Sequence, residues 1–466
     1  MMENPTAEAP TCLNYHTKPL SQAMLAFLCE EDTLFHDPKR LLDDELSLYD
    51  GDNTLKLALL KMVRTLVSIK NWVNKTPQSG NHNEHGQLGE PLRSQVSNCL
   101  TMLDIVRDTY VWEQLNVGHW KTVAPGWRRA YTFLCICKTI FMAIFQKPSM
   151  DIIKECDMGL LMGEPITYGI LDNVLLRFAQ DLSSELRVLN EGEEVVKKPS
   201  SLVQEIPLPV VGRSQCPESR FEIELIDNPS LEHFLNIMKK QCPVLISGGI
   251  DHWPARRKWN IEYICKTAGF RTVPVELGSK YTSDDWTQKL MRVEDFVNSY
   301  ILKTCTNITK EDSSELPRGV GYIAQHRLFE QITELGEDIK VPDYCFLGES
   351  KQVETNAWFG PGNTVSPNHY DPKHNLLAQV FGAKLVRLYP PSESQYLRPF
   401  PATSILFNTS QVDLDDPLVL EKYPDLRHAK YCEFILSPGS MLYIPPKWWH
   451  YITSLTPSFS ISFWFE

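Results

Sequence analysis

SPNHYDPKHN, residues 366–375, is the most informative stretch in the C-terminal half of the chain. It places His369 and Asp371 at alternate positions, and in an extended segment residues i and i+2 point to the same side. One imidazole and one carboxylate can therefore meet a single metal ion. A third ligand must come from elsewhere in the chain. The candidate is His450, which stands in the stretch IPPKWWHYI at the start of another expected strand.

This ligand set indicates the kind of metal. Two histidines and one carboxylate on one side of an ion leave its opposite positions open, as non-haem Fe(II) requires for a chelating co-substrate and O₂. The mouth of a β-barrel is a common place for such a pocket. An isolated H-x-D is frequent in surface loops, so the prediction depends on the residues that accompany it.

Lys384 is the first of these companions. It begins the apolar run LVRLY just after the turn FGA. A lysine that faces the closed interior of a sheet domain requires an anion, and the distal carboxylate of 2-oxoglutarate is such an anion. Alternation along a strand also allows the other interpretation, in which Lys384 faces outward.

The chain after residue 220 has the pattern of an all-β domain. Short β-rich runs separated by glycine and proline turns predict an antiparallel sandwich or barrel, with helical stretches near Ile261–Thr267 and Val293–Leu302. The expected strands are Pro243–Ser247, Thr272–Leu277, Gly319–Ala324, Asn375–Phe381, Lys384–Tyr389, Glu433–Leu436, Ser440–Ile444 and Ser458–Phe465.

The chain from residue 21 to 190 has a helical pattern. An amphipathic stripe at spacings of four and three predicts one helix, and it consists of Leu55, Leu59, Met62, Leu66 and Ile69. Further helices are expected over Leu92–Gln114, Trp127–Phe145 and Ile166–Leu189. No repeat of fixed period and no basic stripe is evident. We interpret this part as a helical domain that binds another protein; the alternative is a scaffold that packs on its neighbour.

Three polar segments bound the expected domains. Residues 1–20 are expected to be disordered, residues 75–91 to form a flexible loop inside the helical domain, and residues 191–219 to form a linker. The sequence thus predicts a helical domain at 21–190 and a catalytic β domain at 220–466. A chain of 466 residues is long enough for two such cores.

Composition narrows the classes of partner. The formal net charge of −12 disfavours direct nucleic-acid binding and favours a cationic peptide. The 12 cysteines form no C-x-x-C pair, which is typical of an intracellular protein without zinc fingers. The N-terminus has no signal-peptide pattern, and the apolar window Phe133–Phe145 is too short to span a membrane.

Taken together, these stretches resemble the core of the JmjC family of 2-oxoglutarate oxygenases. The likeness is carried by NAWFGP, SPNHYDP, NLLAQVFGAK and IPPKWWH, and it extends to DHWP, GYIAQH, SFWF, WRRAY and CDMGLLMG. It implies an α+β protein in which a double-stranded β-helix (a cupin-like jelly roll) follows an N-terminal all-helical domain.

The resemblance also implies roles for individual residues. His369, Asp371 and His450 match the ligands of Fe(II), with 2-oxoglutarate as co-substrate and O₂ as oxidant. The positions that match the co-substrate pocket are Lys384, Tyr322, Ser366, Asn375 and Trp464. The positions that match the wall for a substrate side chain are Glu276, Trp286, Gln325 and Trp358.

These substrate positions have other interpretations as well. The two indoles also suit a hydrophobic core, and the glutamate follows an apolar run and also suits a solvated strand end. A guanidinium is planar, carries five donors and stacks on aromatic rings, so these residue types suit arginine.

The implied activity is hydroxylation of arginine in a protein substrate, by a nuclear chromatin regulator that could also act in the cytoplasm. Two alternatives stay open. One is demethylation of histone N-methyl-lysine at the same iron site, and the other is a jelly-roll binding module without catalysis. A hydrolase triad of Ser366, His369 and Asp371 is disfavoured, because the sequence lacks a nucleophile elbow.

Overall fold

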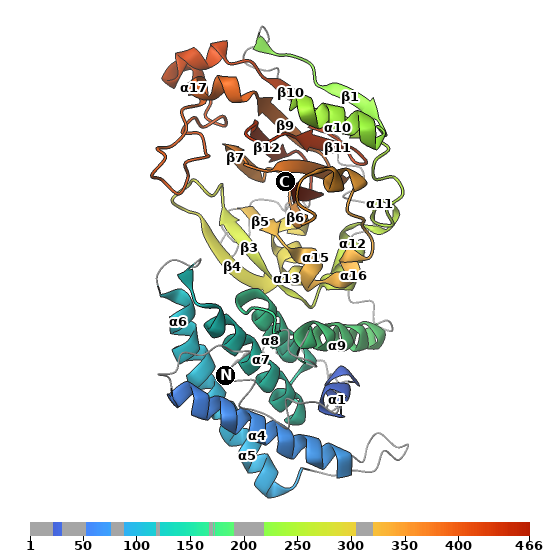
Figure 1. Cartoon of the computed structure of the whole chain (residues 1–466), viewed down its shortest axis with the longest axis vertical. Helices are drawn as coiled ribbons and strands as arrows, with labels where there is room; N and C mark the ends of the chain where they lie inside the picture. Colours follow the sequence, from blue (N-terminus) through green and yellow to red (C-terminus); the bar gives the residue numbers. More distant parts are fainter. Residues whose placement is uncertain are drawn as a thin grey trace, which may run out of the picture. The chain divides into compact units, whose positions relative to one another are not determined.

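The computed structural model describes residues 22–29, 53–75, 88–117, 122–166, 171, 173–190, 219–303 and 320–466. The chain divides into two compact units, Met1–Gly192 and Glu193–Glu466, and each is described here by itself (Figure 1). The expected disordered N-terminus lies outside the described residues. So do residues 76–87 of the expected 75–91 loop and residues 191–218 of the expected linker. The outer bounds of the expected loop are wrong, because Lys75 still belongs to a helix and the next helix begins at Glu90.

The first unit is helical throughout its described part. The predicted stripe of α4 is confirmed, since all five of its apolar side chains are fully buried. The helices are α1 (Gln22–Cys29), α4 (Asn53–Lys75), α5 (Glu90–Ile105), α6 (Trp112–Asn116), α7 (Pro125–Ile144), α8 (Ser149–Met162) and α9 (Val174–Asn190).

Helix α7 is the centre of this unit. It contacts α4, α5, α8 and α9 and buries most of its residues, which explains why its sequence is apolar on every side. A π-helical turn at Val106–Val111 joins α5 to α6 and carries the buried Arg107, which pairs with Asp108 and with Glu155 of α8. Within the described residues, no helix is long and apolar enough to cross a membrane.

One helix prediction is partly wrong. The helix expected from Ile166 begins only at Val174, because Asn173 adopts a left-handed conformation (φ 55°) that a continuous α-helix excludes. Ile166 itself is not helical. Helix α8 was not predicted as a separate element; Gly163 ends it, and Pro165 follows.

The second unit contains two β-sheets whose strands are antiparallel, apart from the parallel pair β1 and β2. The larger has the order β1-β2-β11-β8-β13-β6-β5-β3-β4, and the smaller has the order β10-β9-β12-β7 (Figure 1). The strands are β1 (Glu224–Asp227), β2 (Val244–Ser247), β3 (Thr272–Gly278), β4 (Thr287–Arg292), β5 (Val320–His326), β6 (Glu354–Gly360), β7 (Val365–Tyr370), β8 (His374–Phe381), β9 (Lys384–Tyr389), β10 (Cys432–Leu436), β11 (Met441–Ile444), β12 (Trp449–Ser454) and β13 (Ser458–Phe465).

Two hydrophobic clusters show how the helices and the two sheets pack on one another. The larger cluster joins one face of the nine-stranded sheet to helices that include α10 (Leu231–Lys240) and α12 (Ile261–Ala268). A smaller cluster combines residues of both sheets, such as Leu377 and Leu442 of the large sheet with Val386 and Leu388 of the small one. The two sheets therefore face each other as in a jelly roll.

Strand β13 separates an apolar layer from a polar one. Phe459, Ile461, Phe463 and Phe465 belong to the cluster under the helices. The alternating serines and Trp464 must point to the opposite face, toward the small sheet. Ser462, for example, accepts a hydrogen bond from the indole of Trp358. This face of β13 is therefore polar, whereas its other face is apolar.

Most strand predictions are confirmed within one or two residues. Pro243 stays outside β2, as a residue without an amide hydrogen often does, and Gly319 lies outside the described residues. The helix expected at Val293–Leu302 is α13 (Val293–Phe296) followed by a π-helical turn. Strands β1, β4 and β6 were not predicted.

Candidate active site

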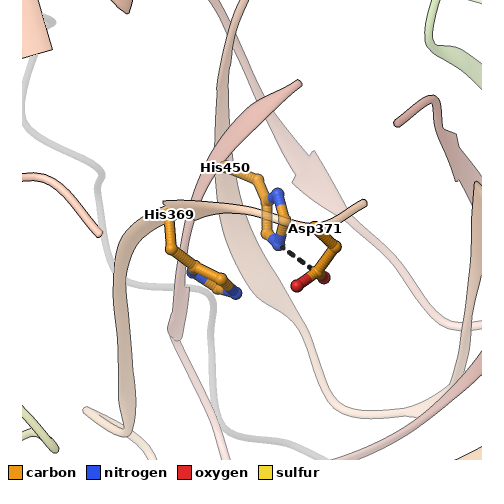
Figure 2. A group of neighbouring side chains, drawn as sticks. All are labelled: His369, Asp371 and His450. Carbon is orange, nitrogen blue, oxygen red and sulfur yellow. Dashed lines mark ion pairs between the residues drawn. The ribbon is translucent and has the colours of Figure 1, made fainter. Parts of the chain in front are cut away.

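The three residues of the sequence motif come together at one point of the small sheet. His369 lies on β7 and His450 directly opposite on β12, with their ring centroids 4.1 Å apart. Asp371 follows the end of β7, and its Oδ2 lies 3.6 Å from His450 Nε2. Figure 2 shows the three side chains pointing toward one another. Their possible ligand atoms all lie within 4.8 Å of one another.

Backbone carbonyls orient both imidazoles. His369 Nδ1 lies 2.7 Å from the carbonyl of Pro367, and His450 Nδ1 lies 3.0 Å from that of Trp448. If Nδ1 donates its hydrogen in each case, Nε2 carries the lone pair and is free to coordinate a metal. Burial, assisted by the neighbouring His369, lowers the pKa of His450 to about 4 and keeps its ring neutral.

The carboxylate gives a direct test of whether the site suits a metal. Asp371 Oδ2 is buried and has no hydrogen-bond partner among the described residues. A buried carboxylate oxygen without a donor is costly, and a cation between the three side chains removes that cost. Two neutral imidazoles and one carboxylate are the donor set that Fe(II) takes in oxygenases. The residues therefore fit the ion.

A bulge in β7 brings Ser366 to the same side as His369. On a regular strand, residues three apart face opposite sides. Here Ser366 pairs with Ile452 and His369 pairs with His450, so β7 has one more residue than β12 between the two pairs. The extra residue reverses the alternation. Consistent with this, Ser366 is near enough to Tyr322 of β5, in the large sheet, to oppose the rise that burial causes in the pKa of the tyrosine hydroxyl.

Lys384 is turned into the interior, so the outward-facing alternative is wrong. Its side chain is 2% exposed, and Nζ donates to the hydroxyl of Tyr322 at 3.1 Å. No carboxylate of the described residues pairs with it. Burial lowers the pKa of Lys384 to about 7. A buried ammonium beside a hydroxyl and without a carboxylate partner is suited to an anionic ligand.

Asn375 and Trp464 lie side by side on β8 and β13. Asn375 Oδ1 and Trp464 Nε1 are both buried and without a partner in the described part of the chain, and the same holds for Asn356 Nδ2 of β6. Buried polar atoms are nearly always satisfied in native proteins. This group therefore indicates a polar ligand between the sheets.

Glu276 and Trp286 form one side of the expected substrate wall. The indole Nε1 of Trp286 donates to Glu276 Oε2 at 3.2 Å. Glu276 is half-buried, and burial raises the pKa of its carboxyl, which disfavours the interpretation as a solvated strand end. Glu276 is also the cross-strand partner of Tyr322, so it lies beside the co-substrate residues. Trp286 is 39% exposed and is not a core aromatic.

Trp358 is turned toward the interior, where its ring centroid lies 6.1 Å from that of Tyr322. Gln325 differs from the other three: it is exposed and occupies a left-handed conformation (φ 47°) where the register of β5 and β6 shifts. Its amide forms no hydrogen bond with Glu276, Trp286 or Trp358. The structure thus brings Glu276 and Trp286 into contact, turns Trp358 toward Tyr322 and leaves Gln325 exposed.

Tyr281 is a site residue that the sequence did not indicate. Its ring stands edge-on to that of His369, with centroids 6.4 Å apart, and its hydroxyl lies 3.3 Å from Thr409 Oγ1. Burial, with the nearby carboxylates of Asp371 and Glu276, raises its pKa to about 12. A lone tyrosine in a polar turn carries no pattern from which this position could be predicted.

Comparison with protein families agrees with the two units. Residues 230–466 match the family described as a cupin-like domain. Residues 103–192 match a family described as KDM8-like N-terminal ARM repeats. The second match identifies helical repeats in this part; ARM repeats are helical units whose similarity lies in packing rather than in a strict sequence period, so the sequence can carry them without an evident fixed period.

Curated relatives cover most of the chain. Lysine-specific demethylase 8 of Xenopus tropicalis is 40% identical over 414 residues, spanning 80% of this chain and 90% of that protein. Lysine-specific demethylase 8 of Danio rerio is 42% identical, spanning 77% and 85%. Jumonji C domain-containing protein 5 of Drosophila melanogaster is 38% identical, spanning 76% and 84%. The chain therefore belongs to the JmjC family and is a cupin-fold, 2-oxoglutarate-dependent oxygenase.

Proposed function

We propose that this chain hydroxylates arginine residues of protein substrates, with Fe(II) held by His369, Asp371 and His450 and with 2-oxoglutarate as co-substrate. The observation that carries the proposal is the cluster of two histidines and one carboxylate on the same small sheet as Lys384, a buried lysine with no carboxylate partner among the described residues. When bound, the iron would supply the activation of O₂ for oxidation of a C–H bond. The chain's own residues position the co-substrate and the target carbon.

Each end of 2-oxoglutarate has its own partners in this proposal. The distal carboxylate would accept from Lys384 Nζ and from the hydroxyls of Tyr322 and Ser366; the first two of these groups are already hydrogen-bonded to each other. The unpaired atoms of Asn375 and Trp464 would complete the polar lining. Because these groups are ordered before the ligand arrives, little conformational entropy is lost on binding.

The substrate wall favours a guanidinium. Glu276 offers a partly desolvated carboxylate, and Trp286 and Trp358 offer ring faces. A planar cation with several donors can pair with the carboxylate and stack on an indole at once. A carbon that carries no nitrogen gives a stable alcohol when hydroxylated, and this supports hydroxylation as the outcome.

Demethylation of N-methyl-lysine is the second candidate, because two of the relatives are named lysine-specific demethylase 8. Oxidation of an N-methyl carbon at the same iron site would release formaldehyde. The two outcomes differ only in which carbon lies nearest the metal.

The helical unit would hold a protein partner, as its family description of ARM repeats suggests. ARM repeats build extended surfaces suited to peptides and proteins. The names of the relatives also support a nuclear role in chromatin regulation, with the cytoplasm as a further location. The net charge of −12 is suited to basic substrates rather than to direct nucleic-acid binding.

Mass spectrometry of a peptide panel tests the substrate. The panel contains arginine peptides and N-methyl-lysine peptides, incubated with the full chain, Fe(II) and 2-oxoglutarate. We expect a gain of one oxygen on arginine that depends on 2-oxoglutarate. Loss of a methyl group from lysine, with arginine unchanged, would instead establish the demethylase.

His369→Ala is the control for the iron site. It removes one metal ligand, so we expect succinate formation to fall by a factor of about 100 or more while the fold is kept. Continued turnover of 2-oxoglutarate at the original rate would show that His369 is not a ligand. Thermal melting of the variant checks that the loss is not caused by unfolding.

A further inference from the structure

The turn between β3 and β4 is tied by two adjacent side chains to both strands that carry the metal-ligand histidines. The turn spans residues 279–286, and its two ends bring Glu276 and Trp286 of the proposed substrate wall together. Lys280 and Tyr281 make the two connections. Lys280 is connected through Asp415 and Tyr281 through Thr409, and both of these residues belong to the segment 409–415.

The first connection is ionic. Lys280 Nζ lies 2.5 Å from Asp413 Oδ2 and 3.6 Å from Asp415 Oδ2, and the lysine side chain is only 17% exposed. Asp415 in turn accepts a hydrogen bond from the hydroxyl of Tyr451. Tyr451 is the neighbour of His450 on β12. The ammonium of Lys280 is thus joined through one carboxylate to the strand of a metal ligand.

The second connection is uncharged. The hydroxyl of Tyr281 lies 3.3 Å from Thr409 Oγ1. Thr409 forms an isolated β-bridge with His369, and the amide of Tyr370 donates to the carbonyl of Asn408. The segment around Thr409 therefore runs as a short extra strand along β7. Through it, the turn is also joined to the other histidine.

The turn itself is ordered by local contacts. Gly278, at φ 124°, gives the chain a conformation that favours glycine, and an added Cβ would come within 3.0 Å of the backbone at Asp285 and Trp286. Ser283 N donates to Lys280 O, and Trp286 N donates to Ser283 O. A turn ordered in this way moves as one piece, so the two outer connections fix the position of Glu276 and Trp286 together.

We propose that Lys280 is a positioning residue that, by pairing with Asp413 and Asp415, holds the Glu276–Trp286 wall at a fixed distance from the iron ligands. The proposal rests on the proposed function for its substrate. Lys280 touches neither substrate nor metal. It acts through the turn, and it also neutralises two carboxylates that would otherwise repel one another at the edge of the site.

The consequence for catalysis is specific. Loss of the ion pair would leave the metal ligands and the co-substrate pocket intact, because neither includes Lys280. Glu276 and Trp286 would then be displaced more often from the position in which they contact the substrate arginine, and the arginine would bind more weakly. Turnover of 2-oxoglutarate without peptide should therefore stay unchanged, whereas the KM for an arginine peptide should rise.

Hydrogen–deuterium exchange on the full chain tests the connection without any activity. Lys280→Ala should make the amides of residues 279–286 exchange about fivefold faster, as expected for loss of a partly buried ionic network. Asp413→Asn should have a similar effect, and Lys280→Arg should restore slow exchange. Lys422→Ala is the matched control: Lys422 pairs with Asp416 at 2.5 Å in the same acidic segment but has no ion pair or hydrogen bond with the turn.

Kinetics with an arginine peptide that the native chain oxidises test the positioning role. Lys280→Ala should raise the peptide KM about fivefold with kcat nearly kept, and Lys280→Arg should return it to the native value. If the amides of residues 279–286 exchange at the native rate in Lys280→Ala, then Lys280 does not hold the turn, whatever the activity of the variant. Faster exchange with an unchanged KM would overturn the positioning role. If the native chain oxidises no arginine peptide, the proposed substrate fails, while the exchange experiment still decides whether Lys280 holds the turn.

Discussion

Lys384 shows at the scale of one residue how function opposes stability. Its ammonium is buried between the sheets beside a tyrosine hydroxyl, and burial lowers its pKa from 10.5 to about 7. Between these values the unfolded chain binds more protons than the folded one. The free energy of unfolding of the ligand-free protein therefore rises with pH from about 7 to 10.5, as far as this group is concerned.

Lys384→Met should separate the effect of this ammonium on stability from its effect on 2-oxoglutarate binding. Methionine fills a similar volume without a charge, so at pH 7 the ligand-free protein should gain about 2 kcal/mol of stability. The affinity for 2-oxoglutarate should fall about tenfold to a hundredfold, since a charge-assisted hydrogen bond is lost. Thermal melting and calorimetric titration measure the two effects. A variant that melts lower and binds 2-oxoglutarate normally would contradict the role of Lys384.

The same pKa predicts how co-substrate binding depends on pH. A bound dicarboxylate favours protonated Lys384, so above pH 7 the complex must take up a proton as it forms. The affinity should therefore decrease by up to tenfold per pH unit from about pH 7 upward. Calorimetry at pH 8 in two buffers of different ionisation enthalpy measures the uptake, which Lys384→Met should abolish. Binding without proton uptake at pH 8 would mean that the lysine is already charged.

At the scale of elements, the turn between β8 and β9 places Lys384 at the first position of its strand. Gly382 in this turn has φ 72°, and an added Cβ would lie 2.1 Å from the carbonyl oxygen of Pro457 and 2.6 Å from Ser458 Cα. Both neighbours are backbone atoms at the start of β13, which cannot move without disturbing the large sheet.

Gly382→Ala should consequently destabilise the second unit by about 3 kcal/mol, through combined backbone strain and overlap. Gly362→Ala serves as the control in the same unit, because its added Cβ meets no atom closer than 3.4 Å. Chemical denaturation of both variants makes the comparison. Equal midpoints for the two would show that the turn relaxes freely.

The elements also show why prediction from sequence succeeds in some places and not in others. Strands such as β9 and β13 could be predicted from their apolar runs. The strand β4 could not, because it is polar and largely exposed at the edge of the large sheet. The bulge in β7 follows from pairing with β12, which no local pattern encodes. For the site, the H-x-D spacing indicated two ligands, whereas Ser366 and Tyr322 could be placed only by family resemblance.

At the scale of the whole chain, two compact units with separate cores make up the protein. The contacts given for the candidate metal ligands, for Lys384 and for the proposed substrate wall all lie within the second unit. A fragment of residues 193–466 should therefore melt cooperatively and bind 2-oxoglutarate like the full chain. Differential scanning calorimetry and titration test this. A fragment that fails to show a cooperative transition would mean that the helical unit is needed for folding.

The pairing of His369 with His450 across two neighbouring strands has a thermodynamic consequence. An ion held there joins β7 to β12 as a cross-link, and it does so only in the folded state, because the unfolded chain keeps these residues apart. Its binding energy is then part of the folding energy. A hundredfold excess of metal over its dissociation constant would add about 2.7 kcal/mol to the free energy of unfolding, so the availability of iron would affect the stability of the fold as well as its activity.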